Sequence, residues 1–251
     1  MPQRRFDGRS ILVTGAGSGI GQAAAVAFGL EGGQVLVADL DLAAARRTAA
    51  QIVEAGGRAH PFEVDATDEA AVERMVAAAV EQHGPLRHAF NNVGLSRGGG
   101  LETMSRTDWD WTLAVSLTST FLCMKHEAPV MRGAGGGTIV NTASMSAKIY
   151  TPSASPAYAA AKAGVVHLTH YASCALAAEG VRVNSVSPGL TATPLIAQMF
   201  DAAQQSAIAA EAQVVARAVT PEEIAAAVLF LSSDEAEMIT GRDLEVSGGR
   251  R

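Results

Sequence analysis

Apolar residues recur along the chain in two alternating patterns. Short runs such as Ser10–Thr14 and Gln34–Asp39 are rich in Val, Ile and Leu, which is typical of buried strands. The stretches between such runs carry apolar residues at helical spacing and are bounded by glycine or proline. Strands that alternate with helices predict a parallel sheet with helices on both faces.

The same alternation continues to the end of the chain without a repeat or a linker. Thr67 is expected to cap the third helix, and Gly84 and Pro85 to end it. Residues 190–218 are helical but irregularly patterned, so this segment is interpreted as a lid over a substrate. The other predicted strands are 58–64, 86–91, 137–142, 181–186 and 243–246, and the other predicted helices are 42–55, 68–83, 105–132, one that contains Tyr158, and 221–231.

The composition fits one compact domain over residues 1–251. The chain is 48% apolar and 18% charged, and α/β domains of this length are routinely single. A net charge of −6 without a sustained basic run argues against a nucleic-acid surface. No stretch approaches the ~18 uninterrupted apolar residues of a membrane span. The start lacks the apolar core of a signal peptide, so the expected location is the cytoplasm.

Neither the cysteines nor the histidines show a metal-binding pattern. Cys123 and Cys174 each lie in an apolar helical pattern without a CxxC partner, so buried free thiols are expected. His167 and His170 are three residues apart, which favours a helix face or a subunit contact over metal ligation.

Candidate acid/base chemistry lies in Tyr158-Ala-Ala-Ala-Lys162. Four residues span about one helical turn, so the two side chains share a helix face. A nearby cation favours the ionised form of a phenol, whose ordinary pKa is about 10. Ser144, fourteen residues upstream, follows a predicted strand and supplies a hydroxyl group. The spacing alone also fits a helix with one buried aromatic residue and one solvated lysine.

A glycine-rich turn joins the first strand to the first helix. Within it, Gly15, Gly19 and Gly21 keep a GxxxGxG spacing, and Gly17 adds a further glycine. Glycine lets the backbone approach a phosphate closely, and the helix N-terminus behind it offers unpaired N–H groups. The turn predicts the pyrophosphate site of a dinucleotide, with a plain glycine-rich turn as the alternative.

Asp39 ends the second strand, twenty-four residues after Gly15. A carboxylate there accepts hydrogen bonds from both adenosine ribose hydroxyls and repels a 2′-phosphate, although a surface aspartate at a strand end is the alternative. Ser18 and Leu40 stand where a basic residue could bind that phosphate, so NAD is preferred over NADP. These features predict a single-domain Rossmann-type α/β fold, a doubly wound parallel sheet of about seven strands flanked by helices on both faces.

Together these motifs resemble the short-chain dehydrogenase/reductase family from Ser10 to Gly249. The family's Asn-Asn-Ala-Gly motif is met by Asn91-Asn92-Val93-Gly94, and its catalytic Ser, Tyr and Lys by Ser144, Tyr158 and Lys162. The resemblance implies a metal-independent, NAD-dependent alcohol dehydrogenase or ketoreductase that forms a homotetramer. It implies cofactor contacts from Gly15, Gly17, Ser18, Gly19, Ile20, Gly21, Asp39, Leu40, Asp65, Ala66, Asn91, Val93, Gly94, Tyr158, Lys162, Pro188, Gly189, Thr191 and Thr193.

Three of these contacts carry a specific role by resemblance. Asp65 reads the adenine amino group, Asn91 shapes the cofactor pocket, and Thr193 orients the nicotinamide carboxamide. The reaction moves a hydride between the nicotinamide and a substrate carbon, while Tyr158 exchanges a proton with the oxygen on that carbon. Ser144 holds this oxygen, and Lys162, with the charge of oxidised nicotinamide, favours the ionised tyrosine and binds the nicotinamide ribose.

Three positions depart from the family pattern. Ser116 stands where the family usually has Asn, a residue that opens the helix locally and helps hold a water beside the lysine. A serine hydroxyl either holds the same water or interrupts this proton relay. Val93 replaces a smaller Ala and narrows the pocket, and Ser247 replaces Asp in the C-terminal Val-Asp-Gly-Gly pattern.

The expected substrate is an uncharged, apolar secondary alcohol or ketone, cyclic or aromatic. A 3-oxoacyl-type ketone reductase and a catalytically decayed dinucleotide-binding sensor or structural subunit are the alternatives. Each apolar residue near the predicted site can equally belong to the core or to a subunit contact. The candidate substrate contacts are Ser144, Met145, Ile149, Tyr150, Leu195 and Met199.

Overall fold

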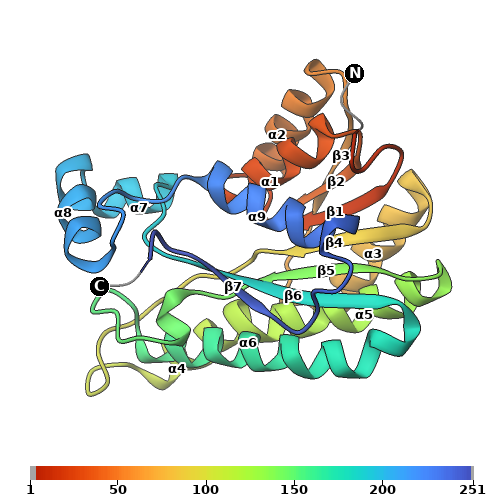
Figure 1. Ribbon diagram of the computed structural model, residues 1–251. Helices are drawn as coiled ribbons and strands as arrows, with labels where there is room; N and C mark the ends of the chain where they lie inside the picture. Colours follow the sequence, from red (N-terminus) through yellow and green to blue (C-terminus); the bar gives the residue numbers. More distant parts are fainter. Residues whose placement is uncertain (1–3, 250–251) are drawn as a thin grey trace.

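The computed structural model describes residues 4–249, and its strands form one seven-stranded parallel sheet (Figure 1). The strand order is β3-β2-β1-β4-β5-β6-β7. This confirms the predicted fold class, a single α/β domain built on a doubly wound parallel sheet. The strands are β1 (Ser10–Thr14), β2 (Gln34–Asp39), β3 (Arg58–Glu63), β4 (Leu86–Asn91), β5 (Gly137–Thr142), β6 (Val181–Pro188) and β7 (Asp243–Val246).

Helices cover both faces of the sheet because the strands are apolar on both faces. In β1, Ile11 and Val13 pack into one core cluster, whereas Leu12 packs into the opposite one. Successive side chains of a strand point to opposite faces, so an unbroken apolar run needs a helical layer on each side. One layer holds α1 (Gly19–Leu30), α2 (Leu42–Glu54) and α9 (Pro221–Ser232), and the other holds α3 (Glu69–His83), α5 (Ser119–Gly133) and α6 (Pro156–Leu176) (Figure 1).

The segment predicted to be a lid leaves the sheet where β6 ends. It contains α7 (Pro194–Met199) and α8 (Ala202–Ala212), which extend beyond the strands at the left of Figure 1. Thr191 pairs with Val219 across the base of this segment. The two ends of this segment are therefore held together, and its action as a lid stays a prediction.

One predicted helix cap and one predicted burial are wrong. α3 is capped by Asp68, whose carboxylate accepts two backbone hydrogen bonds, because Thr67 is engaged in a turn in which its hydroxyl donates to Asp65 at 2.7 Å. Cys174 is exposed, whereas Cys123 is buried as predicted. The apolar residues around Cys174 cover more than one side of α6, so their pattern does not indicate which side meets the sheet.

The described residues, 4–249, include no helix long and apolar enough to cross a membrane. Within the same range, no group of three or more His, Cys, Asp or Glu side chains could hold a metal ion.

A carboxyl group is buried between α5 and the strands β4 and β5. Glu127 of α5 has no exposed surface, and its Oε2 accepts a hydrogen bond from Asn91 Nδ2 at 3.0 Å. Asn91 also donates to Asn141 Oδ1, which links the ends of β4 and β5. Glu127 Oε1 has no hydrogen-bond partner in the part of the chain that the structure describes. Burial therefore raises the pKa of Glu127 to about 7.

Glu127→Gln is expected to make stability less dependent on pH. The folded state favours the neutral acid. The stabilisation that protonated Glu127 provides is therefore complete below its ordinary pKa of 4.5 and is lost as the pH rises through about 7. Within that window the wild type loses up to about 1.4 kcal/mol per pH unit relative to the variant. Melting temperatures measured across this range should show the variant gaining on the wild type, with no further gain above pH 7.

The exposed Glu81→Gln on α3 is the matched control. A melting-temperature difference between Glu127→Gln and wild type that is constant across the pH range would contradict the raised pKa.

Candidate active site

The carboxyl end of β5 and the first turns of α6 bring Ser144, Tyr158 and Lys162 together. Ser144 caps a short 3-10 turn, where its Oγ accepts a hydrogen bond from Ser146 N at 3.1 Å. Tyr158 and Lys162 lie one turn apart on α6, and the Ser144 side chain is close enough to the Tyr158 phenol to lower its pKa. Lys162 Nζ lies 5.7 Å from the centre of the Tyr158 ring. The three candidates from distant motifs thus share one site.

Burial opposes charge at both titratable groups of this site. Lys162 is 1% exposed and donates to Thr142 O at 2.7 Å, and burial lowers its pKa to about 7. Burial also raises the pKa of Tyr158, an effect that the nearby Ser144 side chain partly offsets. Burial therefore favours the neutral phenol and weakens the preference of Lys162 for its ammonium form, and added positive charge would favour ionisation of Tyr158.

Ser116 lies in a widened helical turn, at the position where the family's usual Asn opens the helix. The expected uninterrupted helix over 105–132 is instead α4 (Arg106–Leu113), a π-helical turn (Ala114–Thr118) and α5. Ser116 is fully buried, and its Oγ donates to Leu95 O at 2.7 Å and accepts from Leu95 N at 3.0 Å. Single π-helical turns often mark functional sites. Here the wider turn accompanies a hydroxyl that holds the loop after β4.

Gly94 separates this contact from the lysine. A Cβ atom at Gly94 would lie 2.6 Å from Lys162 Nζ and 3.6 Å from Ser116 Oγ. The first distance is shorter than van der Waals contact, so any side chain at this position would displace the ammonium group. Ser116 and Lys162 are thus close neighbours, joined through a residue that has to be glycine.

The glycine-rich turn fits the pyrophosphate of a dinucleotide. A Cβ atom at Gly21 would lie 2.1 Å from Gly15 O, so the turn closes too tightly for a side chain there. Ser18 is the N-cap of α1 but makes no side-chain hydrogen bond to the helix, which leaves the first N–H groups for an anion. The turn lies where the strand order reverses between β1 and β4, the usual position of a ligand in such sheets.

Asp39 reaches back toward this turn. Its Oδ2 accepts a hydrogen bond from Gly17 N at 2.8 Å, and its Oδ1 accepts one from Asp41 N at 2.9 Å. Ser18 and Leu40 are both exposed beside it. The carboxylate therefore lies close to the place where the ribose next to a bound pyrophosphate belongs.

The other predicted cofactor contacts lie at the same edge of the sheet, with differing side-chain roles. Asp65 is exposed and its Oδ1 accepts from the backbone and hydroxyl of Thr67, whereas Asn91 points into the buried contact with Glu127. Thr193 caps α7, and its methyl carbon lies 3.3 Å from the position of a Cβ at Gly19. Thr191, Ile20, Ala66, Val93, Pro188 and Gly189 lie in the strand ends or in the segments that follow them.

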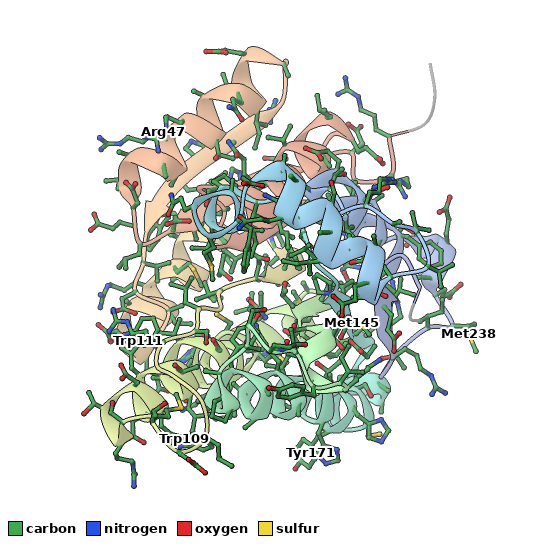
Figure 2. The ribbon with its side chains drawn as sticks, turned by 90° about the vertical axis from the view of Figure 1, so that its left-hand side faces the viewer. Arg47, Trp109, Trp111, Met145, Tyr171 and Met238 are labelled. Carbon is green, nitrogen blue, oxygen red and sulfur yellow. The ribbon has the colours of Figure 1, made fainter. Side chains whose placement is uncertain are left out.

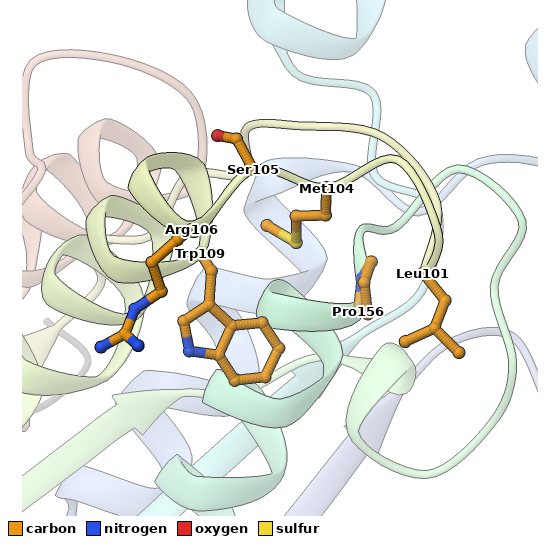
Figure 3. Close-up of a pocket in the computed structure, with 6 residues that line it drawn as sticks. All are labelled: Leu101, Met104, Ser105, Arg106, Trp109 and Pro156. Carbon is orange, nitrogen blue, oxygen red and sulfur yellow. The ribbon is translucent and has the colours of Figure 1, made fainter.

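The predicted substrate contacts divide by exposure. Met145 is buried near the middle of the molecule in Figure 2, and Ile149 is half-buried. Tyr150, Leu195 and Met199 are exposed, with Tyr150 at 89%. An open hollow of about 390 Å³ lies nearby but includes none of Ser144, Tyr158 and Lys162; its lining residues are Leu101, Met104, Ser105, Arg106, Trp109 and Pro156 (Figure 3).

Sequence reasoning missed two side chains that hold the site. Ser155 caps α6 and Glu127 holds Asn91. The pair Ser155-Pro156 is a recognisable start of a helix, because Pro is favoured directly after an N-cap serine. Glu127 carries no such signal, since its contact joins residues 36 positions apart.

Comparisons with known proteins agree over nearly the whole chain. The family model adh_short_C2, described as Enoyl-(Acyl carrier protein) reductase, matches residues 15–251. Cyclohexanol dehydrogenase of Acinetobacter sp. (strain SE19) is 38% identical over 245 residues, which cover 97% of this chain and 95% of that protein. D-threitol dehydrogenase of Mycolicibacterium smegmatis is also 38% identical, with 98% of this chain and 94% of that protein covered.

A solved structure matches the fold equally well. It is titled 7 alpha-hydroxysteroid dehydrogenase complexed with NADH and 7-oxo glycochenodeoxycholic acid. The TM-score is 0.93 and the identity 29%, with 99% of this chain and 96% of that chain covered.

Ser116→Ala is expected to lower both stability and turnover. Alanine removes two hydrogen bonds to the Leu95 backbone, each worth about 1 kcal/mol, so the melting temperature should fall by several degrees. Ser116→Asn, whose amide can both donate and accept, should retain more of each property. Calorimetry and kcat measured with NAD and a secondary alcohol test this. Equal losses in the two variants would show that the contact with Leu95 is not the reason.

Proposed function

Because this chain belongs to the short-chain dehydrogenase/reductase family, we propose that it uses NAD to interconvert an uncharged secondary alcohol and its ketone. The chain is an oxidoreductase of secondary alcohols or ketones, as its relatives are, and it binds a nicotinamide dinucleotide. The observation that carries the proposal is the grouping of Ser144, Tyr158 and Lys162 at the sheet edge that also holds the glycine-rich turn.

Each of the three side chains has its own task. Tyr158 exchanges a proton with the substrate oxygen, and Ser144 holds that oxygen with a hydroxyl that lies near the phenol. The ammonium group of Lys162 donates one hydrogen bond to Thr142 O, which leaves two N–H donors for the nicotinamide ribose. Bound nicotinamide supplies the hydride acceptor or donor.

The same contacts account for the ionisation that the protein alone opposes. Hydrogen bonds from Lys162 to ribose oxygens favour its ammonium form, whose pKa burial otherwise lowers to about 7. The ammonium group in turn favours the ionised Tyr158. Tyr158 is therefore able to transfer a proton mainly when the cofactor is bound, which is also when the hydride can move.

The two cations near the predicted substrate segments already have partners within the protein, which supports an uncharged substrate. Lys148 Nζ lies 2.7 Å from carboxylate oxygens of both Asp243 and Glu245, so its charge is already paired. The guanidinium of Arg97 stacks on Trp111, 3.6 Å from the ring centre. The relationship to cyclohexanol dehydrogenase supports a cyclic alcohol.

Preference for NAD rests on Asp39. Its carboxylate lies against the Gly17 backbone, and the neighbouring Ser18 and Leu40 offer no positive charge to a 2′-phosphate.

A 3-oxoacyl-type ketone reductase is the second candidate, favoured by the family model's description as an acyl carrier protein reductase. The decayed sensor is disfavoured because Ser144, Tyr158 and Lys162 all lie in one site. Assays of cyclic alcohols and a 3-oxoacyl thioester, each with both cofactors, separate the three.

Assembly and location complete the proposal. We place the protein in the cytoplasm as a homotetramer. The exposed apolar residues Phe121 and Tyr171 on α5 and α6 support burial of these helices against another subunit. Tyr171 projects from the lower edge of the molecule in Figure 2.

Tyr158→Phe is expected to retain NAD binding and to lose most turnover. The phenol is the proposed proton donor and acceptor, and such catalysis contributes about 10²–10⁴-fold. Tyr171→Phe is the matched control, because it removes a phenol hydroxyl from the same helix and keeps the apolar ring of the proposed subunit contact. Steady-state kinetics and NADH fluorescence titration measure the two properties. Activity of Tyr158→Phe within a few-fold of wild type would refute the assignment.

Asp39→Ala and Asp39→Asn are expected to weaken discrimination against NADP. Both remove a negative charge that repels the 2′-phosphate, so the ratio of kcat/KM for NAD to that for NADP should fall about tenfold or more, which corresponds to roughly 1.4 kcal/mol. Asn keeps an oxygen that can accept from Gly17 N, so it separates the loss of charge from distortion of the turn. An unchanged ratio in both variants would leave Asp39 without a role in cofactor choice.

A further inference from the structure

The helix that carries Tyr158 begins at a buried cap. Ser155 is 6% exposed, and its Oγ accepts a hydrogen bond from Tyr158 N at 3.2 Å. Its carbonyl oxygen accepts from Ala159 N at 3.0 Å. Pro156 occupies the first helical position, where its fixed φ suits a helix. Tyr158 therefore lies in the first turn, with its own backbone N–H held by the cap.

The same hydroxyl is tied to the loop that follows β4. Ser96 Oγ donates to Ser155 Oγ at 2.8 Å. Ser96 lies directly after Leu95, which Ser116 holds through both backbone groups. The hollow in Figure 3 also has one wall from this loop at Leu101 and another from α6 at Pro156. The loop and the start of α6 therefore meet at the Ser96 contact and beside the hollow.

We infer that Ser155 is a positioning residue for Tyr158, and that its hydrogen bond with Ser96 couples the 95–100 loop to the position of the catalytic phenol. The first turn of a helix frays when its cap is lost, because its N–H groups then lack partners. Proton transfer depends steeply on distance, and a displacement of about 1 Å can cost about 10²-fold in rate. This inference rests on the proposed role of Tyr158.

The central experiment compares two caps of the same design. Thr220 caps α9 as Ser155 caps α6: its side chain accepts from Glu223 N at 3.3 Å, and Pro221 follows it. Ser155→Ala and Thr220→Ala should each cost about 1 kcal/mol, or about 2–4 °C in melting temperature. Only Ser155→Ala should lower kcat, by about tenfold or more, with the KM for NAD unchanged. Ser155→Thr keeps the cap and should restore kcat.

Ser96→Ala tests the coupling to the loop. It leaves the cap of α6 in place and removes one hydrogen bond, so stability should fall by about 1 kcal/mol while kcat falls as well. In the double variant with Ser155→Ala, the loss of Ser96 should have no further effect, because the shared hydroxyl is already gone. If the two effects on kcat multiply, the coupling is refuted.

A titration distinguishes this inference from the proposed function, since it does not require turnover. The chain has three tyrosines, so a Tyr150→Phe/Tyr171→Phe background leaves Tyr158 as the titrating phenol. Burial raises its pKa, and Ser155→Ala should move the ultraviolet titration midpoint back toward the ordinary value, whereas Thr220→Ala should not. An unchanged midpoint together with kcat within twofold of wild type would show that Ser155 is only a structural cap.

Discussion

The seven strands of residues 4–249 run parallel, and the site depends on this constraint because their carboxyl ends then lie along one edge of the sheet. The glycine-rich turn follows β1, Asp39 ends β2, and Ser144 follows β5. Residues more than one hundred positions apart thereby lie along one edge of the sheet, where we propose that they meet the cofactor and the substrate. The apolar strands enforce the arrangement, since each needs helices on both faces and parallel connections supply them.

The same burial makes charge costly around the site. The ordinary pKa is 10.5 for Lys162 and 4.5 for Glu127, and burial moves both to about 7. Lys162 bonds to a carbonyl oxygen and Glu127 to an amide, so neither has an opposite charge as its hydrogen-bond partner. Burial thus opposes charge on Tyr158 and Lys162, and in the proposed mechanism the bound cofactor favours their ionisation.

Polar contacts with the backbone set the positions of these groups. Ser116 holds Leu95 through both of its backbone groups, and Ser155 holds the N–H of Tyr158. Ser96 joins the two contacts, because it follows Leu95 and donates to Ser155. The site is therefore supported by a short chain of hydroxyl groups that runs from the π-helical turn to the catalytic helix. One of these hydroxyl groups belongs to Ser116, which stands where the family usually has Asn.

The sequence alone was enough for the order of the strands and helices, the fold class and the three motifs of the site, because periodicity and motif spacing are local properties. It was not enough to place the cap of α3, where Thr67 and Asp68 compete, or to show that Cys174 is exposed. Only the tertiary structure decided that Ser116 contacts Leu95, that Glu127 is buried against Asn91, and that Ser96 reaches Ser155. Those contacts join residues 21 to 59 positions apart, and which distant residues meet depends on how the helices pack against the sheet rather than on any pattern along the chain.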